Sequence, residues 1–142
     1  MKVFLDTWVL IEKYKGNVIA ERVLEDAENR FEAYVSHITI AEITNVISRE
    51  YGEREARVQF AYLRRSPIRL VPMTEEIARD AGLLKTRHRF SLADAIILSS
   101  ALTVKADVLV TGGEKQYEDE WKRVTEMQVV KLADFTDGVK TS

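Results

Sequence analysis

The sequence contains no cysteine, and this absence excludes disulfide bonds, thiolate metal sites and a cysteine nucleophile. It contains two histidines, His37 and His88, which are too few for a histidine-rich metal site. A bound metal ion should therefore have carboxylate oxygens as its ligands, and such ligands favour hard ions such as Mg²⁺ or Mn²⁺.

Long apolar runs and an excess of one charge are also missing. No uninterrupted apolar stretch approaches the roughly 18 residues of a membrane span. Asp6 interrupts the first apolar run before the core of a signal peptide could form, so we expect a cytoplasmic protein. The formal net charge is −2, so a nucleic-acid partner would have to be recognised by a local basic patch.

The chain has the length and composition of one ordinary globular domain. It has 142 residues, of which 46% are hydrophobic and 31% charged. It shows no internal repeat, low-complexity segment or linker. We therefore expect a single domain over residues 1–135, followed by a frayed tail over residues 136–142.

Strand-like and helix-like patterns alternate along the chain. The expected strands are Val3–Leu5, Phe31–Ser36, Ile68–Val71, Asp107–Thr111 and Met127–Lys131. The expected helices are Trp8–Tyr14, Val18–Arg30, His37–Tyr51, Glu53–Arg65, Glu75–Lys85, Ser91–Leu102 and Lys115–Arg123. Strands that alternate with helices predict an α/β fold, a three-layer α/β/α sandwich around a mainly parallel sheet of about five strands.

Three of these segments carry patterns typical of buried elements. The first strand is a continuous apolar run, which is typical of a central strand covered on both faces. The helix His37–Tyr51 has apolar residues nearly all round, and Ser91–Leu102 has almost no charge after Asp94. We expect both helices to be buried.

Three acids are expected at the same edge of the sheet. Asp6 directly follows the first strand, and Glu42 and Asp94 lie in the first turns of the two apolar helices. In a parallel sheet, ligands bind at the carboxyl ends of the strands, where the following helices begin. The three carboxylates could therefore converge on one site.

Each acid alone also has a purely structural explanation. Asp6 or Thr7 could cap the helix that follows the first strand. The segments Thr39–Glu42 and Ser91–Asp94 both match the capping box, in which the third helical residue bonds back to the capping backbone.

The apolar neighbours of Glu42 and Asp94 favour a functional role. Ile38 and Val46 lie one turn to either side of Glu42, and Ile97–Leu98 lies one turn beyond Asp94. Burying ionised carboxylates without a partner costs several kcal/mol, and placing three of them together adds repulsion. A cation is the natural compensation.

Four segments follow one another along nearly the whole chain: FLDTWVL, TIAEITNVI, SLADAIILSSAL and DVLVTGGEKQY. In their order and spacing they resemble the successive motifs of PIN domains, especially the VapC toxins of bacterial and archaeal toxin–antitoxin pairs. The resemblance implies a metal-dependent endoribonuclease with Mg²⁺ or Mn²⁺ as cofactor. It also implies a homodimer that is blocked by a VapB-like antitoxin.

The resemblance assigns roles to individual residues. It implies that Asp6, Glu42 and Asp94 are catalytic and metal-binding acids, with Thr7 and Thr111 as supporting hydrogen-bond donors. PIN domains usually have an acid or an asparagine two residues after the position of Thr111.

The chain departs from this last feature. Gly113 stands at the position two residues after Thr111, and Glu114 is the nearest replacement as a fourth metal ligand, with Glu118 and Asp119 further along.

A basic connector precedes the helix of Asp94. Lys85, Arg87 and Arg89 could bind RNA phosphates near the acids, or they could form a solvated charged face. His88, between them, is expected to be a surface residue or a phosphate contact. Arg64, Arg65 and Arg69 form a second basic group, for which we expect a solvated face.

Two other functions are alternatives to the nuclease. A phosphohydrolase of the haloacid dehalogenase type needs a second aspartate two residues after the first, and Trp8 occupies that position. A PIN-fold module without catalytic activity, which binds RNA or protein, is the stronger alternative because Gly113 departs from the PIN pattern.

Overall fold

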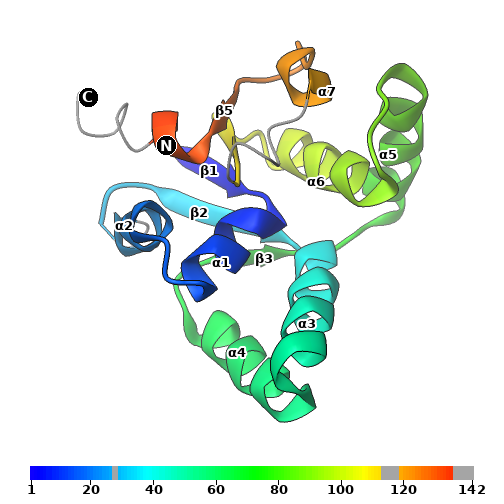
Figure 1. Ribbon diagram of the computed structural model, residues 1–142. Coiled ribbons are helices and arrows are strands. Elements are labelled where there is room, and N and C mark those ends of the chain that lie inside the picture. Colours follow the sequence, from blue (N-terminus) through cyan, green and yellow to red (C-terminus); the bar gives the residue numbers. More distant parts are fainter. Residues whose placement is uncertain (27–28, 113–118, 136–142) are drawn as a thin grey trace.

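A parallel sheet lies at the centre of the computed structural model, which describes residues 1–26, 29–112 and 119–135 (Figure 1). Within these residues five strands pair in the order β3-β2-β1-β4-β5, and every neighbouring pair is parallel. The strands are β1 Lys2–Leu5, β2 Glu32–Ser36, β3 Arg69–Val71, β4 Val108–Thr111 and β5 Val129–Lys131. The prediction that the first strand is central is confirmed.

Helices cover both faces of this sheet. They are α1 Thr7–Tyr14, α2 Val18–Asp26, α3 His37–Tyr51, α4 Glu53–Arg65, α5 Glu75–Arg87, α6 Leu92–Thr103 and α7 Asp119–Lys122, with one further turn over residues 132–135. The three-layer α/β/α fold agrees with the prediction. The expected tail, 136–142, lies outside the described residues, and no helix within them has the length and apolar character that a membrane span requires.

The alternation of side chains along β1 builds two separate cores. Phe4 points to one face, where it packs with buried residues of α5 and α6 such as Ile77 and Ile97. Val3 and Leu5 point to the other face and belong to a core shared with α1 and α2. The continuous apolar run of β1 is thus explained by burial on both faces.

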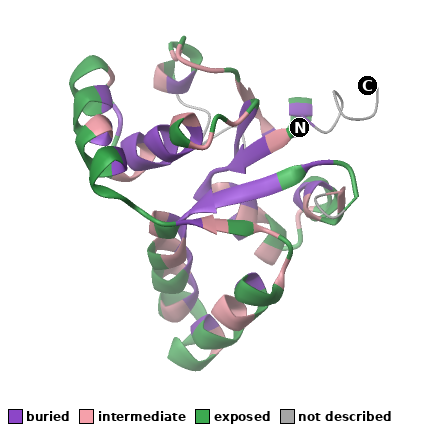
Figure 2. Ribbon diagram, turned by 180° about the vertical axis from the view of Figure 1, so that it is seen from behind, coloured by how far each residue is buried: buried purple, intermediate pink, exposed green. Residues whose placement is uncertain are grey.

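The two helices expected to be buried differ in the structure. In α6 every residue from Ala95 to Ala101 is buried, and Figure 2 shows it largely in purple, like the central strands. The prediction for α3 is wrong, because Thr39, Ile43 and Ile47 are its buried residues and its opposite face is exposed. The helix packs against α1 and α4 beyond the edge of the sheet, so one face is enough for its contacts.

The basic connector is shorter than expected. Helix α5 continues to Arg87, so Lys85 and Arg87 belong to its last turn, where positive charges are favoured by the helix dipole. Only residues 88–91 connect α5 to α6.

Candidate active site

Asp6 lies where β1 ends and α1 begins. Its backbone N–H donates to the carbonyl of Val110 in β4 at 3.0 Å, which extends the pairing of the two strands. Its carboxylate accepts a hydrogen bond from the N–H of Val9 at 3.3 Å, so Asp6 is indeed the N-cap of α1. With 3% exposure it is also a deeply buried acid.

The surroundings of Asp6 make its ionised form unfavourable. Burial raises the pKa of Asp6 to about 7, although N–H groups of Gly112 and Val9 donate to the carboxylate and oppose the rise. The negative charge of Asp94 raises the pKa further. A cation beside Asp6 and Asp94 would remove the repulsion between them and favour the ionised form.

Gly112 is a positioning residue that sequence reasoning missed. It follows β4, and its backbone N–H donates to the carboxylate of Asp6. A Cβ atom on Gly112 would overlap the Cβ of Trp8 and would lie 3.1 Å from the carbonyl carbon of Trp8. Only glycine allows this close approach of β4 to the first turn of α1. The glycine pair after a buried strand was a visible signal, but nothing in the sequence identifies Trp8 as its neighbour.

Thr7 connects α1 to α3 by two side-chain hydrogen bonds. Its hydroxyl donates to Oε1 of Glu42 at 2.5 Å, and the hydroxyl of Thr39 lies 2.9 Å from it. Because Thr7 has a single hydroxyl proton, which goes to Glu42, Thr39 donates to Thr7. These hydrogen bonds thus hold Glu42 beside Thr7, the residue that follows Asp6.

The capping-box interpretation of Glu42 is wrong. The N-cap of α3 is Ser36, whose hydroxyl accepts from the N–H of Ile38 at 3.1 Å. Glu42 therefore lies in the second turn of α3, too far along the helix to bond back to its cap. Its described partner is Thr7.

Asp94 lies in the first turn of α6. The hydroxyl of Ser91, the N-cap, accepts from the N–H of Asp94 at 3.2 Å, so the predicted capping role of Ser91 is confirmed. The acid is partly exposed, and its negative charge contributes to the raised pKa of Asp6. The two carboxylates therefore lie within electrostatic range of each other.

The donor set of this site fits a hard divalent cation. It consists of carboxylate oxygens, and burial and like charge together disfavour the ionised state of Asp6. Among the described residues, however, no group of three or more acidic or histidine side chains is close enough to hold a metal ion. Within the described residues, Asp94 lies within electrostatic range of Asp6, and Glu42 is hydrogen-bonded to Thr7, the residue after Asp6.

Two further site residues were predicted at the end of β4 and just after it: Thr111 as a hydrogen-bond donor and Glu114 as a metal ligand. Thr111 is fully buried, and its hydroxyl lies 3.4 Å from the carbonyl oxygen of Val130 in β5. Gly113 and Glu114 lie outside the described residues, so the fourth ligand stays a prediction.

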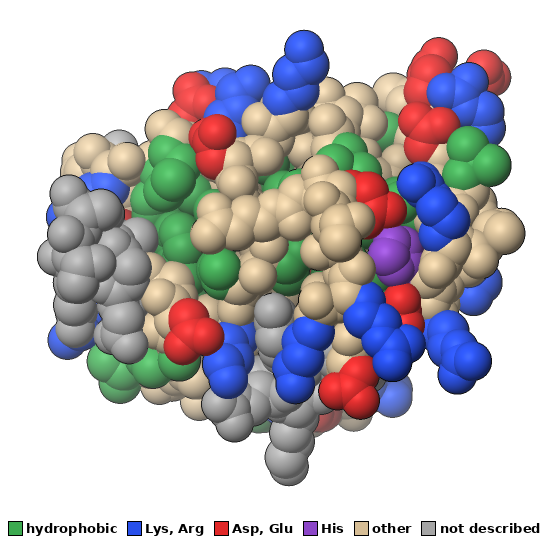
Figure 3. Space-filling view, turned by 90° about the horizontal axis from the view of Figure 1, so that it is seen from above, with side chains coloured by type: hydrophobic (Ala, Val, Ile, Leu, Met, Phe, Trp, Pro, Cys, Tyr) green, Lys and Arg blue, Asp and Glu red, His purple; other side chains and the backbone are tan. Residues whose placement is uncertain are grey.

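Two of the three predicted RNA-binding residues have partners within the chain. The ammonium group of Lys85 donates to the carbonyl of Phe90 at 2.9 Å, and Arg87 lies 3.7 Å from a carboxylate oxygen of Glu126. Arg89 is exposed. On the face shown in Figure 3, basic side chains are interspersed with acidic ones.

Two arginines of the second basic group also contact other side chains of the protein. Arg69 lies 3.4 Å from Glu32 and stands over the ring of Tyr34, and Arg64 stands over the ring of Phe60. The prediction of a solvated face for this group agrees with the exposure of both arginines.

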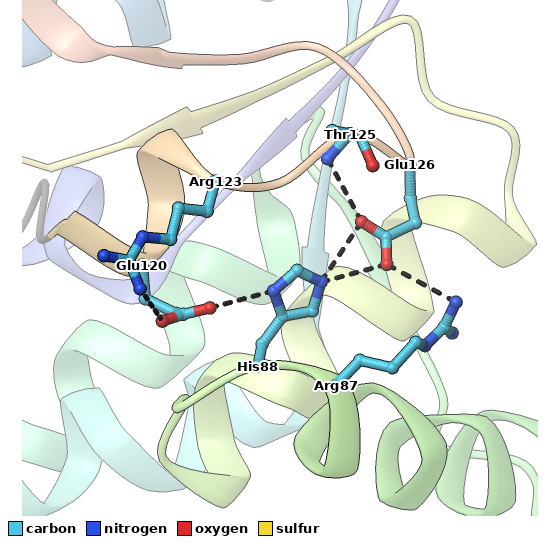
Figure 4. A network of polar contacts seen from close by, with 6 residues as sticks. All are labelled: Arg87, His88, Glu120, Arg123, Thr125 and Glu126. Atoms are coloured by element: carbon cyan, nitrogen blue, oxygen red, sulfur yellow. Dashed lines mark hydrogen bonds and ion pairs between the residues drawn. The ribbon is translucent and has the colours of Figure 1, made fainter.

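The expectation for His88 is wrong. Its side chain is only 9% exposed, and each ring nitrogen faces a glutamate, Glu120 or Glu126 (Figure 4). The sequence carried no signal for these contacts, because the two acids follow His88 by 32 and 38 residues.

Fold and site together define an α/β protein in which three acids, one directly after β1 and the others in α3 and α6, lie at the carboxyl edge of a parallel sheet. The sequence matches the family model of the PIN domain over residues 3–121, and the chain belongs to this family. Comparison with the sequences of curated proteins gives no significant match.

Several solved structures are similar over most of the chain. VapBC-1 of nontypeable Haemophilus influenzae has 25% identity and a TM-score of 0.70, covering 94% of this chain and 99% of that chain. VapBC2 of Rickettsia felis, bound to a DNA fragment from its promoter, has 18% identity and a TM-score of 0.74, covering 92% and 98%. VapC20 of Mycobacterium tuberculosis, a toxin that cleaves the sarcin–ricin loop, has 18% identity and a TM-score of 0.63, covering 75% and 86%.

Proposed function

We propose that this protein is a metal-dependent endoribonuclease and the toxin of a VapBC-type toxin–antitoxin pair. The observation that carries the proposal is the buried carboxylate of Asp6 at the end of the central strand of a PIN domain, where the charge of Asp94 also reaches it. Structures described as VapBC complexes and as an RNA-cleaving VapC toxin have the same fold, which supports the choice.

Each acid would have a distinct role at a divalent ion. When bound, Mg²⁺ or Mn²⁺ supplies an activated water and neutralises charge that develops on the scissile phosphate. Asp6 and Asp94 would be the principal ligands, and Glu42 a ligand or the group that orients the water. The sequence after Gly112 contains Glu114, which we propose as the fourth ligand.

The surrounding residues hold these acids in place. The N–H groups of Val9 and Gly112 fix the carboxylate of Asp6, and the hydroxyl of Thr7 fixes Glu42. Ser91 caps the helix that carries Asp94. Such preorganisation reduces the rearrangement needed when ion and substrate bind.

RNA phosphates would be bound by the basic residues around the start of α6. Arg89 is exposed, and Lys85 and Arg87 would have to exchange their contacts with Phe90 and Glu126 for phosphate. We therefore expect Arg89 to contribute most of this binding.

An antitoxin and a second copy of the chain are the proposed protein partners. An apolar cavity of about 620 Å³ opens between α1, α2, α3 and α4, and its lining includes Leu10, Tyr14, Leu24, Val46 and Tyr62 but none of the three acids. Its size suits several apolar side chains of a bound segment. We propose that the antitoxin docks here. The similar VapBC structures support an antitoxin as a partner, and the cavity supports the choice of surface.

Manganese titration followed by thermal melting tests the enzyme against a PIN-fold module that has lost catalysis. The wild-type protein should show a saturable rise in melting temperature with Mn²⁺ and should cleave RNA. Asp94→Asn should show neither. Asp80→Asn is the matched control, since this acid lies in α5 and its partner is the exposed Arg79.

Two results would count against this proposal. If Mn²⁺ leaves the melting temperature of the wild-type protein unchanged, the binding module is favoured. An equal rise in Asp94→Asn would place the ion elsewhere in the chain and would overturn the proposed site.

A further inference from the structure

His88 is the C-cap of α5 and lies between two glutamates. Its Nδ1 is 2.9 Å from Oε2 of Glu120, and its Nε2 is 3.0 Å from Oε2 of Glu126 (Figure 4). Carboxylates accept hydrogen bonds, so both ring nitrogens have to donate. A neutral imidazole has one N–H group, and only the imidazolium form satisfies both contacts.

The charges around the ring favour this form. Burial alone lowers the pKa of His88, but hydrogen bonds and charges of Glu126 and Glu120 outweigh burial and raise the pKa above 6.5. The hydrogen bond from His88 lowers the pKa of Glu120 in turn. Arg87 lies 3.7 Å from Glu126 and Arg123 lies 3.9 Å from Glu120, and both arginines are exposed.

These contacts join three segments that are distant in sequence. His88 belongs to the corner between α5 and α6, Glu120 belongs to α7, and Glu126 precedes β5. The ring of Phe90 packs against His88 at a centroid distance of 5.0 Å and against Trp121 at 4.5 Å. Polar and aromatic contacts thus fix the same corner.

This corner leads directly into the helix that carries Asp94. Phe90 precedes Ser91, the N-cap of α6, and the carbonyl of Phe90 accepts from Lys85 at 2.9 Å. A displacement of the corner would move the first turn of α6. The described contacts therefore couple His88 to the position of Asp94 through this corner.

We propose that protonated His88 is a positioning residue, which clamps α7 and the segment before β5 to the α5–α6 corner and so holds the first turn of α6 in place. The consequence for catalysis rests on the proposed nuclease function, whereas the clamp itself does not.

The clamp depends on pH in a defined direction. Because the pKa of His88 is raised on folding, its stabilisation is complete below the pKa of histidine in the unfolded chain, near 6.5. It is lost as the pH rises through the higher pKa of the folded protein. The first turn of α6 should therefore loosen on the alkaline side.

Side-chain NMR of the whole metal-free protein tests the protonation of His88. The chain has two histidines, so the spectrum contains two imidazole signals, and the exposed His37 is assigned with His37→Gln. We expect His88 to carry protons on both nitrogens at pH 6 and to titrate above pH 6.5. A neutral tautomer at pH 6 would overturn the proposal.

Amide hydrogen exchange tests the positioning role independently of nuclease activity. The N–H of Ala95 donates to the carbonyl of Ser91 at 3.1 Å in the first turn of α6, and the N–H of Ala78 donates to Thr74 at 3.0 Å in α5. Since hydrogen bonds to charged groups are the strong ones, His88→Gln should reduce protection at Ala95 by about tenfold or more and leave Ala78 unchanged.

The variants distinguish failure of the clamp from failure of the nuclease. Glu120→Gln should lower the pKa of His88 in the NMR titration and reduce protection at Ala95, and it serves if His88→Gln does not fold. Unchanged protection at Ala95 in both variants would overturn the positioning role. If the wild-type protein cleaves no RNA, the exchange result still decides the clamp, and the nuclease function alone fails.

Discussion

Replacing Asp6 with asparagine should stabilise the metal-free protein above neutral pH. The pKa of Asp6 is about 7 in the folded chain, against an ordinary value of 3.8. One pKa unit corresponds to about 1.4 kcal/mol, so ionising Asp6 in the folded protein costs about 4 kcal/mol. The asparagine side chain stays neutral, and its oxygen can accept the same N–H groups.

The direction of the pH dependence follows from linkage. Between the unfolded and folded pKa values the folded state binds more protons, so the free energy of unfolding falls as the pH rises from about 4 to about 7. Above this range the penalty is constant. The wild-type protein should therefore lose about 3 kcal/mol relative to Asp6→Asn between pH 5 and pH 8.

Urea unfolding at pH 5 and pH 8, with a chelator present, measures this difference. Titration of His88 contributes equally to both proteins and cancels in the comparison. Asp80→Asn controls for the loss of one carboxylate, because its partner Arg79 is exposed. Parallel pH profiles of wild type and Asp6→Asn would refute the buried-charge argument.

Addition of Mn²⁺ should make the wild-type protein more stable than Asp6→Asn, the reverse of the order expected without metal. The ion would favour ionised Asp6 in the wild-type protein and would have no charged partner at that position in Asp6→Asn, so only the wild type should gain. The same substitution should abolish metal-dependent RNA cleavage, and undiminished cleavage would contradict the proposed mechanism.

Two further substitutions test the positioning contacts. Gly112→Ala should lower the free energy of unfolding by about 1–3 kcal/mol in urea, because the added Cβ would overlap Trp8. Gly82→Ala in α5 is the control and should be neutral or stabilising, because its added Cβ meets open space. Thr7→Val should cost about 1–3 kcal/mol by removing the donor to Glu42, and Thr7→Ser should restore most of this loss; equal stability of the two variants would argue against the hydroxyl's role.

Periodicity and strand composition were sufficient to predict the order of elements. The expected helix His37–Tyr51 and the expected helix Glu53–Arg65 have the observed bounds, and the other described boundaries differ by a few residues. The exposed face of α3 could not be predicted, because apolar residues on several sides of a helix do not reveal whether a partner covers each side.

The contacts that hold the site were beyond sequence reasoning. Thr7 and Glu42 are 35 residues apart, and Gly112 meets Trp8 although β1 and β4 are distant in sequence. Spacing within one element predicts which side chains share a face, but the partner on another element depends on how the elements pack. His88 is the clearest case, since its neighbours in the sequence are basic, whereas its ring nitrogens contact two glutamates in the folded protein.

The sequence by itself determined the α/β class, the central position of β1 and the placement of Asp6 and Asp94 at the ends of buried elements. Hydrophobic patterning acts locally, and these features depend on it. Only the tertiary structure decided that burial and Asp94 raise the pKa of Asp6, that Glu42 is held by Thr7, and that His88 lies between two acids that raise its pKa. Burial and charge pairing are properties of packed neighbours, and packing joins residues that the linear order keeps apart.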